Sequence, residues 1–437
     1  MKIEANNITD YFKRYIRSIE YIQPSDYQQI DEHLAVMVDQ KGPKYKKRES
    51  AQWLWEHFFR IAINQITENS RGLNRLFKYF EEFVQYENLL LAIDKYHRDH
   101  VIHSVWVMLL GFYLRKKCSV FSSMSLGYFI CDHEEDTDNK RDIGMLLKKY
   151  SIPGWILIAL SHDLGYPIQK TVYANEYMGK MIRNFGFLEE QQFKYNFTVI
   201  HHTTINALLE LLSSAVRLTK KGAEDEFVIT NNPGVTLDCA RSFEKLDHGI
   251  MSAYILQNYL DFICDVRSES TSRNTTMQPE EAAQFAMIID LLYSMAAHSN
   301  QYAYWRGIGL NKPSALLFIC DELDEFSRYS YSRHKDGWVM MNCETTLVLD
   351  KNHIMFEYIF SNKNVVDDTN FEMHFKHKIG NIADRFQLDD IFNRIKVMCR
   401  DKTRKNPISL SYEKSRKNGI TVEEITGTQK GKRKKNH

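Results

Sequence analysis

Apolar residues recur at helical spacing along much of the chain. Between residues 51 and 95 they follow the spacing that is typical of amphipathic helices with one face on a core. The segment from Asp99 to Lys117 is apolar on nearly every side and predicts a buried helix. Further helices are predicted at residues 144–150, 154–163, 172–185, 203–220, 246–265, 279–297 and 314–328. We therefore expect a mainly α fold.

The pattern changes after residue 336, where two runs rich in β-branched and aromatic residues flank Asp350-Lys351-Asn352. Such runs around a polar turn predict a β-hairpin. Apolar residues from Phe375 to Ile395 then predict a final amphipathic helix, and we expect the polar residues beyond it to be poorly ordered. The predicted parts are an N-terminal helical region packed on the core (1–95), a central helical domain (96–335), a hairpin-helix region (336–402) and a flexible basic tail (403–437).

The overall charge does not imply a global attraction to polyanions. The 437 residues carry a formal net charge of +1, so neither nucleic acid nor an anionic membrane is an implied partner. A basic run from Lys430 to Lys435 is typical of a solvated chain end, and contact of this run with phosphate or nucleic acid stays open as an alternative.

Cysteine usage and hydropathy predict the compartment. The seven cysteines form no C-x-x-C pair, which favours a reducing environment over a disulfide framework. The first residues contain no apolar segment typical of a signal peptide, and no apolar run is long enough to span a bilayer. We expect a soluble cytoplasmic protein with no membrane association.

Ionisable residues lie at the ends of several of the predicted apolar helices. His162 and Asp163 directly follow the apolar run Ile156–Leu160, and buried ionisable groups are costly unless they are paired or bound to a metal. The other such residues are His103, His248, His298 and Asp321. Imidazole and carboxylate are ligands of divalent metals, and helical bundles build metal sites from facing helices. The pattern therefore predicts a metal centre.

Three segments, "HSVWVMLLG", "LSHDLGYP" and "CDELDEFSR", together resemble the HD-domain metal-dependent phosphohydrolase superfamily. The resemblance runs from about residue 97 to about residue 330 and covers a His, a His-Asp pair and a distal Asp, each on its own helix. It implies an HD-domain helical bundle, which with the predicted flanking segments gives an N-terminal helical extension and a small C-terminal α+β appendage. It also implies that the first metal is bound by His103, His162, Asp163 and Asp321.

Some members of this superfamily bind a second metal through additional histidines. By resemblance, His248 in "DHGIMSA" and His298 in "MAAHSN" would serve this purpose, and the His201-His202 pair competes with them. The implied cofactor is one or two divalent ions, with manganese, iron, magnesium, nickel and zinc all open.

Further residues could contact a phosphate or the attacking water. Lys170 follows Asp163 by about two helical turns, and we expect it either to bind phosphate or to be a surface lysine. His100, one turn before His103, would contact substrate or water, or be structural. The arginines predicted to bind substrate phosphate are Arg98 and Arg328, with Arg306 and Arg333 as weaker choices.

The segment after the His-Asp pair departs from two branches of the superfamily. Residues 166–170, YPIQK, lack the further polar catalytic residues of the deoxynucleotide triphosphohydrolases. The sequence Gly165-Tyr166-Pro167 is not in the position of the Gly-Tyr-Pro signature of the cyclic dinucleotide phosphodiesterases. The branch is therefore left open.

The absence of other motifs favours metal-assisted hydrolysis. The sequence contains neither a G-x-S-x-G elbow nor a G-x-x-x-x-G-K-[ST] loop. We expect a metal-dependent phosphohydrolase or phosphodiesterase that cleaves a phosphoester or anhydride of a nucleotide-type small molecule with metal-activated water. The expected catalytic residues are Asp163, Lys170 and His100. The alternative is an HD-fold nucleotide sensor or partner-binding module with little turnover. Homo-oligomer formation also stays open.

Overall fold

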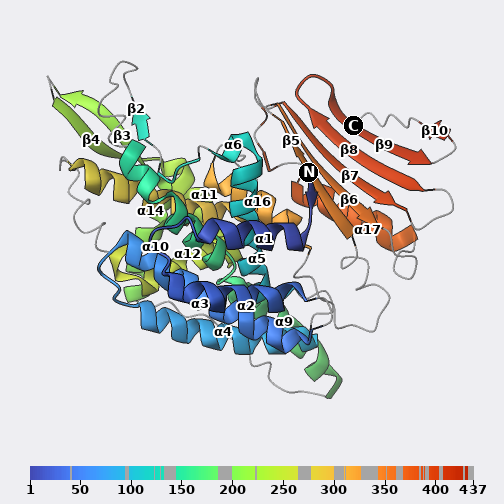
Figure 1. Ribbon diagram of the computed structural model, residues 1–437, viewed down its shortest axis with the longest axis horizontal. Coiled ribbons are helices and arrows are strands. Elements are labelled where there is room, and N and C mark those ends of the chain that lie inside the picture. The colour runs from blue at the N-terminus through green and yellow to red at the C-terminus, as the bar shows by residue number, and fades with distance from the viewer. Residues whose placement is uncertain are drawn as a thin grey trace. The chain divides into compact units, whose positions relative to one another are not determined.

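The computed structural model is mainly helical, with a sheet near the C-terminal end (Figure 1). It separates into two compact units. Unit 1 comprises Met1–Leu54, Leu90–Ser123 and Arg306–His437, and unit 2 comprises Trp55–Leu89 and Met124–Trp305. The structure describes residues 1–39, 42–93, 98–122, 124–127, 129–131, 144–185, 199–221, 224–263, 277–299, 310, 312–325, 343–350, 352–360, 368–382, 385–386, 388, 393–402, 407–426 and 429–431.

Unit 1 is organised around helix α5, His100–Lys117, which is buried from His100 to Leu114. The Asp99 carboxylate caps this helix by accepting a hydrogen bond from the backbone N–H of Ile102, and it forms a 2.6 Å ion pair with Arg48. Within the described residues this unit also contains α1 (Ala5–Ile16), η1 (Pro24–Asp26), α2 (Tyr27–Val38), the first part of α3 (Lys44–Ile66), α6 (Ser119–Ser122), α16 (Pro313–Leu323) and α17 (Asp368–Ile382). Helices α1, α6 and α16 all pack on α5.

The sheet of unit 1 has seven strands in the order β1-β5-β6-β7-β8-β9-β10. Its strands are β1 (Lys2–Ile3), β5 (Cys343–Leu349), β6 (His353–Phe360), β7 (Arg394–Asp401), β8 (Ile408–Ser415), β9 (Gly419–Thr426) and β10 (Gln429–Gly431). The predicted hairpin is confirmed, because β5 and β6 pair antiparallel on either side of residues 350–352. Strands β6 and β7 are parallel, and α17 lies between them in sequence and packs on β7 (Figure 1).

Two predictions for the C-terminal part are wrong. The segment 407–426 is not a flexible tail, because β8 and β9 pair along their full length within the sheet. The last helix ends at Ile382, and Ile395 lies in β7. In that strand Ile395, Val397 and Cys399 are buried at alternate positions, the period of a strand rather than a helix. Pairing with distant strands decides the structure there, and a local apolar pattern cannot predict such pairing.

Unit 2 contains most of the remaining helices. Helices α3 (Lys44–Ile66) and α4 (Leu73–Ile93) contribute most of their length to it. It also holds α8 (Ser151–Ser161), α9 (Tyr166–Ile182), η2 (Arg183–Phe185), α10 (Val199–Ser213), α11 (Pro233–Glu244), α12 (His248–Tyr259), α14 (Pro279–His298) and a helix over residues 144–149. Helix α14 packs against both α8 and α12. Most of the predicted helices are therefore confirmed within a few residues.

A second sheet interrupts one predicted helix. The expected helix over residues 203–220 ends at Ser213, where strand β3 (Ser214–Lys221) begins. It pairs antiparallel with β4 (Glu224–Asn231) and parallel with β2 (Phe129–Cys131). Val216 and Leu218 are buried at alternate positions of β3, so the apolar residues there follow the period of a strand.

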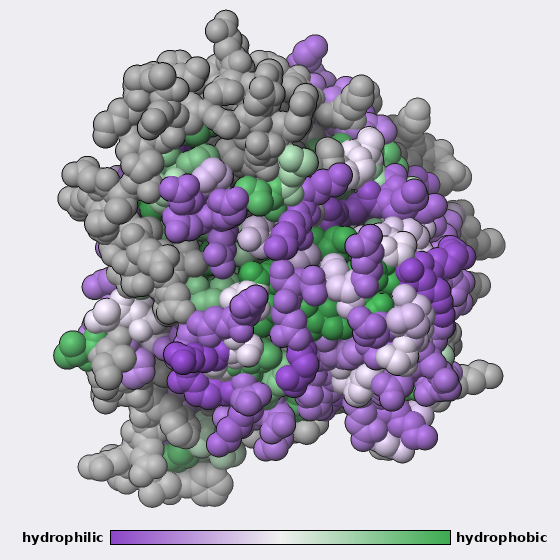
Figure 2. All heavy atoms as spheres, turned by 60° about the vertical axis from the view of Figure 1, so that its left-hand side comes forward, coloured by the Kyte–Doolittle hydropathy of each residue, from purple (hydrophilic) through white to green (hydrophobic). Residues whose placement is uncertain are grey.

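None of the helices within the described residues has the length and hydropathy required to cross a membrane. Figure 2 shows one face of the molecule, where hydrophilic side chains separate the exposed hydrophobic ones into small patches. Large exposed apolar residues are dispersed over different helices, as Met178 on α9, Val199 on α10 and Leu237 on α11 illustrate.

Candidate metal centre

The His162-Asp163 pair lies in the turn between α8 and α9 of unit 2. Helix α8 is buried at every position except Ile152, and His162 is its C-cap residue. Two aromatic side chains hold the backbone on either side of the pair. The indole N–H of Trp55 donates to the carbonyl of Leu160 over 2.7 Å, and the hydroxyl of Tyr79 donates to the carbonyl of Leu164 over 2.7 Å. The first bond satisfies a carbonyl in the last turn of α8, and the second fixes the turn that follows the helix.

Gly165 lets the start of helix α12 approach this turn. A Cβ atom at Gly165 would lie 2.4 Å from the carbonyl oxygen of His248 and 2.6 Å from the Cβ of Met251. The Gly165 N–H donates to the hydroxyl of Ser252 over 2.8 Å, and that hydroxyl donates to the His248 carbonyl over 2.8 Å. The absent side chain therefore brings His248 next to the His-Asp pair.

His248 begins α12, and His298 ends α14. The Asp247 carboxylate caps α12 by accepting from the N–H of Gly249, and it also accepts a hydrogen bond from the hydroxyl of Ser299. A Cβ atom at Gly249 would lie 2.6 Å from the carbonyl oxygen of Met295, so this glycine permits close contact between the two helices. As a result, His248 Nε2 lies 3.1 Å from His298 Nε2.

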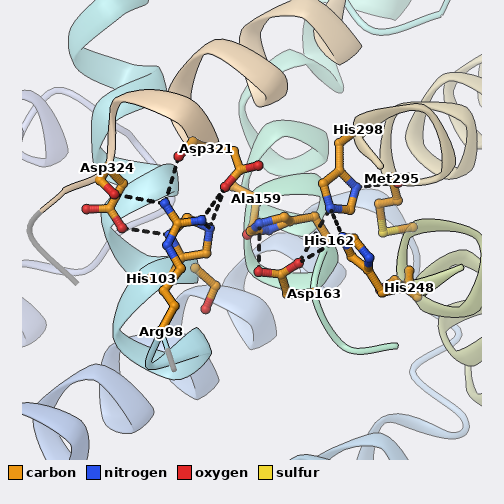
Figure 3. Close-up of polar contacts among 12 residues, drawn as sticks. Arg98, His103, Ala159, His162, Asp163, His248, Met295, His298, Asp321 and Asp324 are labelled. Atoms are coloured by element: carbon orange, nitrogen blue, oxygen red, sulfur yellow. Dashed lines mark hydrogen bonds and ion pairs between the residues drawn. The ribbon is translucent and has the colours of Figure 1, made fainter. Parts of the chain in front are cut away.

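Three histidines of unit 2, His162, His248 and His298, each direct Nδ1 at an oxygen acceptor (Figure 3). His162 Nδ1 lies 2.9 Å from the Ala159 carbonyl, and His298 Nδ1 lies 2.5 Å from the Met295 carbonyl. His248 Nδ1 lies 3.0 Å from Oε1 of Gln169. Because a carbonyl oxygen can only accept, Nδ1 carries the proton in each ring and Nε2 is left with its lone pair. This is the tautomer of a metal-ligating histidine whose other nitrogen is held by an acceptor.

The Nε2 atoms converge on the carboxylate of Asp163. Its Oδ1 lies 3.4 Å from His298 Nε2 and 3.8 Å from His248 Nε2, and its Oδ2 lies 3.2 Å from His162 Nε2. Asp163, His248 and His298 offer ligand atoms within 4.8 Å of one another and could hold a metal ion. The site is largely buried, with His162 0% and Asp163 7% exposed. Imidazole nitrogen with carboxylate oxygen fits a divalent transition metal.

His103 and Asp321 come together in unit 1. His103, on α5, is fully buried, and its Nε2 lies 3.0 Å from Oδ1 of Asp321, in the last turn of α16. Its Nδ1 lies 2.6 Å from Oδ2 of Asp324. The predicted ligands thus form two groups, one in each unit. That the two groups bind a common ion stays a prediction.

Arg98 is engaged at the end of α16 (Figure 3). Its Nη1 lies 2.5 Å from Oδ1 of Asp321 and 3.1 Å from Nε2 of His103. Its Nη2 donates to the carbonyls of Asp321 and Asp324, each over 2.8 Å. The guanidinium neutralises Asp321 and caps the helix, so it is already bound where we predicted a substrate contact.

The other predicted residues have varied surroundings. His100 is the buried first residue of α5. Lys170 lies on α9 with Nζ 5.1 Å from the ring centroid of Tyr166, whose ring lies edge to face with His248. His201 and His202 lie on α10, and His202 is exposed, so the structure does not bring it into the Asp163 group. Arg306, Arg328 and Arg333 lie outside the described residues.

Sequence reasoning missed the residues that orient the histidines. Gln169 and Asp324 each hold the Nδ1 atom of a predicted ligand. A usable signal existed for Asp324, because it follows Asp321 by one helical turn and an acidic residue is a common partner of a ligating histidine. No signal in the sequence could identify the Gln169 contact, which joins residues that are 79 positions apart.

Comparisons with known proteins identify no relative: no family model, no curated protein and no solved structure matches this chain.

Proposed function

We propose that this protein is a metal-dependent phosphohydrolase or phosphodiesterase of the HD-domain type, acting on a nucleotide-type substrate. The observation that carries the proposal is the arrangement of Asp163, His248 and His298. Three properties support it: the ligand atoms converge, Asp163 and His298 are buried with His248 half-buried, and the histidine Nδ1 atoms are held by acceptors. Clusters of buried ionisable side chains whose ligand atoms converge are typical of functional sites.

The residues of unit 2 suggest how the site would act on a phosphoester. Asp163, His248 and His298 would hold the ion, with His162 beside the Asp163 carboxylate. A bound divalent cation supplies Lewis-acid stabilisation of phosphate charge and lowers the pKa of water. Lys170 projects from α9 at the edge of this group and could pair with a substrate phosphate. Asp163 would also accept a proton or a hydrogen bond at the reacting centre.

One observation favours a second candidate function, an HD-fold nucleotide sensor or binding module with little turnover. Arg98 lies 2.5 Å from the Asp321 carboxylate and already neutralises a predicted metal ligand. A protein that kept this ion pair would bind metal through the unit 2 group without a complete hydrolytic centre. The two candidates differ in turnover and in metal stoichiometry.

The decisive experiment combines metal analysis with a turnover assay. The purified protein would be loaded with manganese, its bound metal counted, and phosphate release measured on nucleoside mono-, di- and triphosphates and cyclic nucleotides. Asp163→Asn preserves side-chain shape and should abolish turnover, and exposed Asp350→Asn is the matched control. Nucleotide binding without turnover in the wild type would support the sensor. A protein that binds neither metal nor nucleotide would refute both candidates.

A further inference from the structure

The acidic segment at the end of α16 contains two pairs of carboxylates that have different partners. Its sequence is Asp321-Glu322-Leu323-Asp324-Glu325, so the members of each pair are three positions apart. Asp321 and Asp324 contact Arg98 and His103, as described above. Glu322 and Glu325 are 5% and 7% exposed and contact neither of these residues within the bonds described.

The second pair is bound by Lys378, which projects from α17. Its Nζ lies 3.0 Å from Oε2 of Glu322 and 3.0 Å from Oε1 of Glu325, and the lysine side chain is 0% exposed. A fully buried ammonium is stable only with close anionic partners, so this interaction holds α17 and the end of α16 in one arrangement.

The same lysine also satisfies the helix end. Its Nζ donates to the carbonyl of Glu322 over 3.2 Å, and the hydroxyl of Tyr358 donates to that carbonyl over 3.2 Å. Burial, and secondly the carboxylates of Glu322 and Glu325, hold the pKa of Tyr358 well above its ordinary value, so its phenol remains a donor. Tyr358 lies on β6, and the ammonium of Lys378 lies 4.6 Å from its ring centroid.

The residues bound by Lys378 alternate in sequence with those that hold His103. Helix α16 ends at Leu323, and Asp324 is its C-cap residue with an extended backbone. Glu322 and Glu325 therefore cannot move without shifting Asp321 and Asp324, their immediate neighbours. Arg98 on one pair and Lys378 on the other together fix the position of the whole segment.

We propose that Lys378 is a positioning residue for the metal-ligating half formed by His103 and Asp321. Through Glu322 and Glu325 it holds Asp324 against Nδ1 of His103, which fixes the ring with Nε2 directed at Asp321. The C-terminal sheet, through α17 and β6, is thereby a working part of the site rather than an appendage. The contacts of Lys378 with Glu322 and Glu325 do not depend on the proposed function, whereas their relevance to metal binding rests on it.

Histidine ¹⁵N spectra of the full, metal-free chain test this proposal. Nδ1 of His103 lies 2.6 Å from the Asp324 carboxylate, which can only accept, so we expect Nδ1 to carry a proton in the wild type. The variant Lys378→Met leaves two buried carboxylates without their cation and risks unfolding. The triple variant Lys378→Met/Glu322→Gln/Glu325→Gln removes all three charges with little change in volume. Lys376→Met, at an exposed position of the same helix, is the matched control.

We expect the triple variant to keep the wild-type far-UV circular dichroism. Its His103 ¹⁵N signals should change from those of one Nδ1-protonated form to those of a mixture of forms, whereas Lys376→Met should give the wild-type spectrum. A triple variant that folds and retains the wild-type His103 spectrum would overturn the proposal. Manganese affinity is a separate readout, expected to fall by about tenfold in the triple variant. A changed His103 spectrum with unchanged affinity would support the positioning role and contradict a metal-binding role for His103.

Discussion

The Nε2 atoms of His248 and His298 lie 3.1 Å apart, although the two residues are separated by 50 positions in the sequence. The Nδ1 atom of each ring is already committed to an oxygen acceptor. Two lone pairs at this distance repel each other unless a proton or a cation lies between them. This relationship is the strongest physical reason to expect a bound cation in unit 2.

Replacement of His298 should therefore abolish tight metal binding. His298→Ala removes a buried imidazole that is held in the ligating tautomer. We expect manganese affinity to fall by more than about 100-fold, because losing a ligand costs more than losing a residue that only orients a ligand. Isothermal titration with manganese measures the effect. His202→Ala, at an exposed position of α10, is the control and should bind as the wild type does. Equal affinities of the two variants would remove His298 from the site.

Replacement of Gln169 tests the orientation of His248. Gln169→Leu removes the acceptor 3.0 Å from Nδ1 of His248 without removing a ligand. The ring then loses its fixed tautomer, and we expect manganese affinity to fall by about 10- to 100-fold with unchanged stoichiometry. Metal titration and elemental analysis provide the two values. A loss of stoichiometry instead would mean that Gln169 itself binds the ion.

Replacement of Gly165 tests the close approach of α12. In Gly165→Ala the new methyl group would lie 2.4 Å from the His248 carbonyl oxygen, so the turn and the helix must separate. We expect a loss of about 1–3 kcal/mol in the free energy of unfolding, together with weaker metal binding. Urea denaturation measures the first quantity. In Gly380→Ala, where a Cβ meets nothing within 4 Å, stability should not decrease, because alanine is the better helix former.

Alkaline pH should weaken the N-terminal helices through Tyr11. Burial, with a smaller contribution from Tyr15, raises the pKa of Tyr11 to about 12 from an ordinary value of 10.0. The folded state therefore keeps a proton that the unfolded state loses. The resulting stabilisation is complete below pH 10 and is lost as pH rises towards 12. Urea midpoints between these values should decline less steeply in Tyr11→Phe than in the wild type. Tyr45→Phe, at a 61% exposed position, should decline as the wild type does.

The helices were predictable because their apolar spacing is a local property. Helix α5 and helix α8 are buried on all sides, and a continuous apolar run ending in polar residues predicts them directly. The strands β3 and β7 were not predicted, since each depends on pairing with segments outside its own window. The helices predicted over residues 214–220 and 394–395 are therefore wrong, because the buried apolar residues there alternate with the period of a strand.

The candidate ligands were predictable in type but not in their surroundings. His162 and Asp163 were identified because ionisable residues directly follow an apolar run, and His248 and His298 because they lie at helix ends. Arg98 was predicted to bind substrate phosphate, whereas its guanidinium binds the carbonyls of Asp321 and Asp324. The sequence does not reveal these contacts. Contacts between segments far apart in sequence have no local signal.

The edge strand β1 joins segments that are far apart in the sequence, because Lys2 and Ile3 pair with Thr346 and Thr345 of β5. During ribosomal synthesis, which is vectorial, this edge cannot close until residue 346 has emerged. Helices such as α1 and α2 can form long before that point, since their hydrogen bonds are local. Assembly of unit 1 is therefore a late event, and a nascent chain that stalls before β5 would hold β1 without its strand partner.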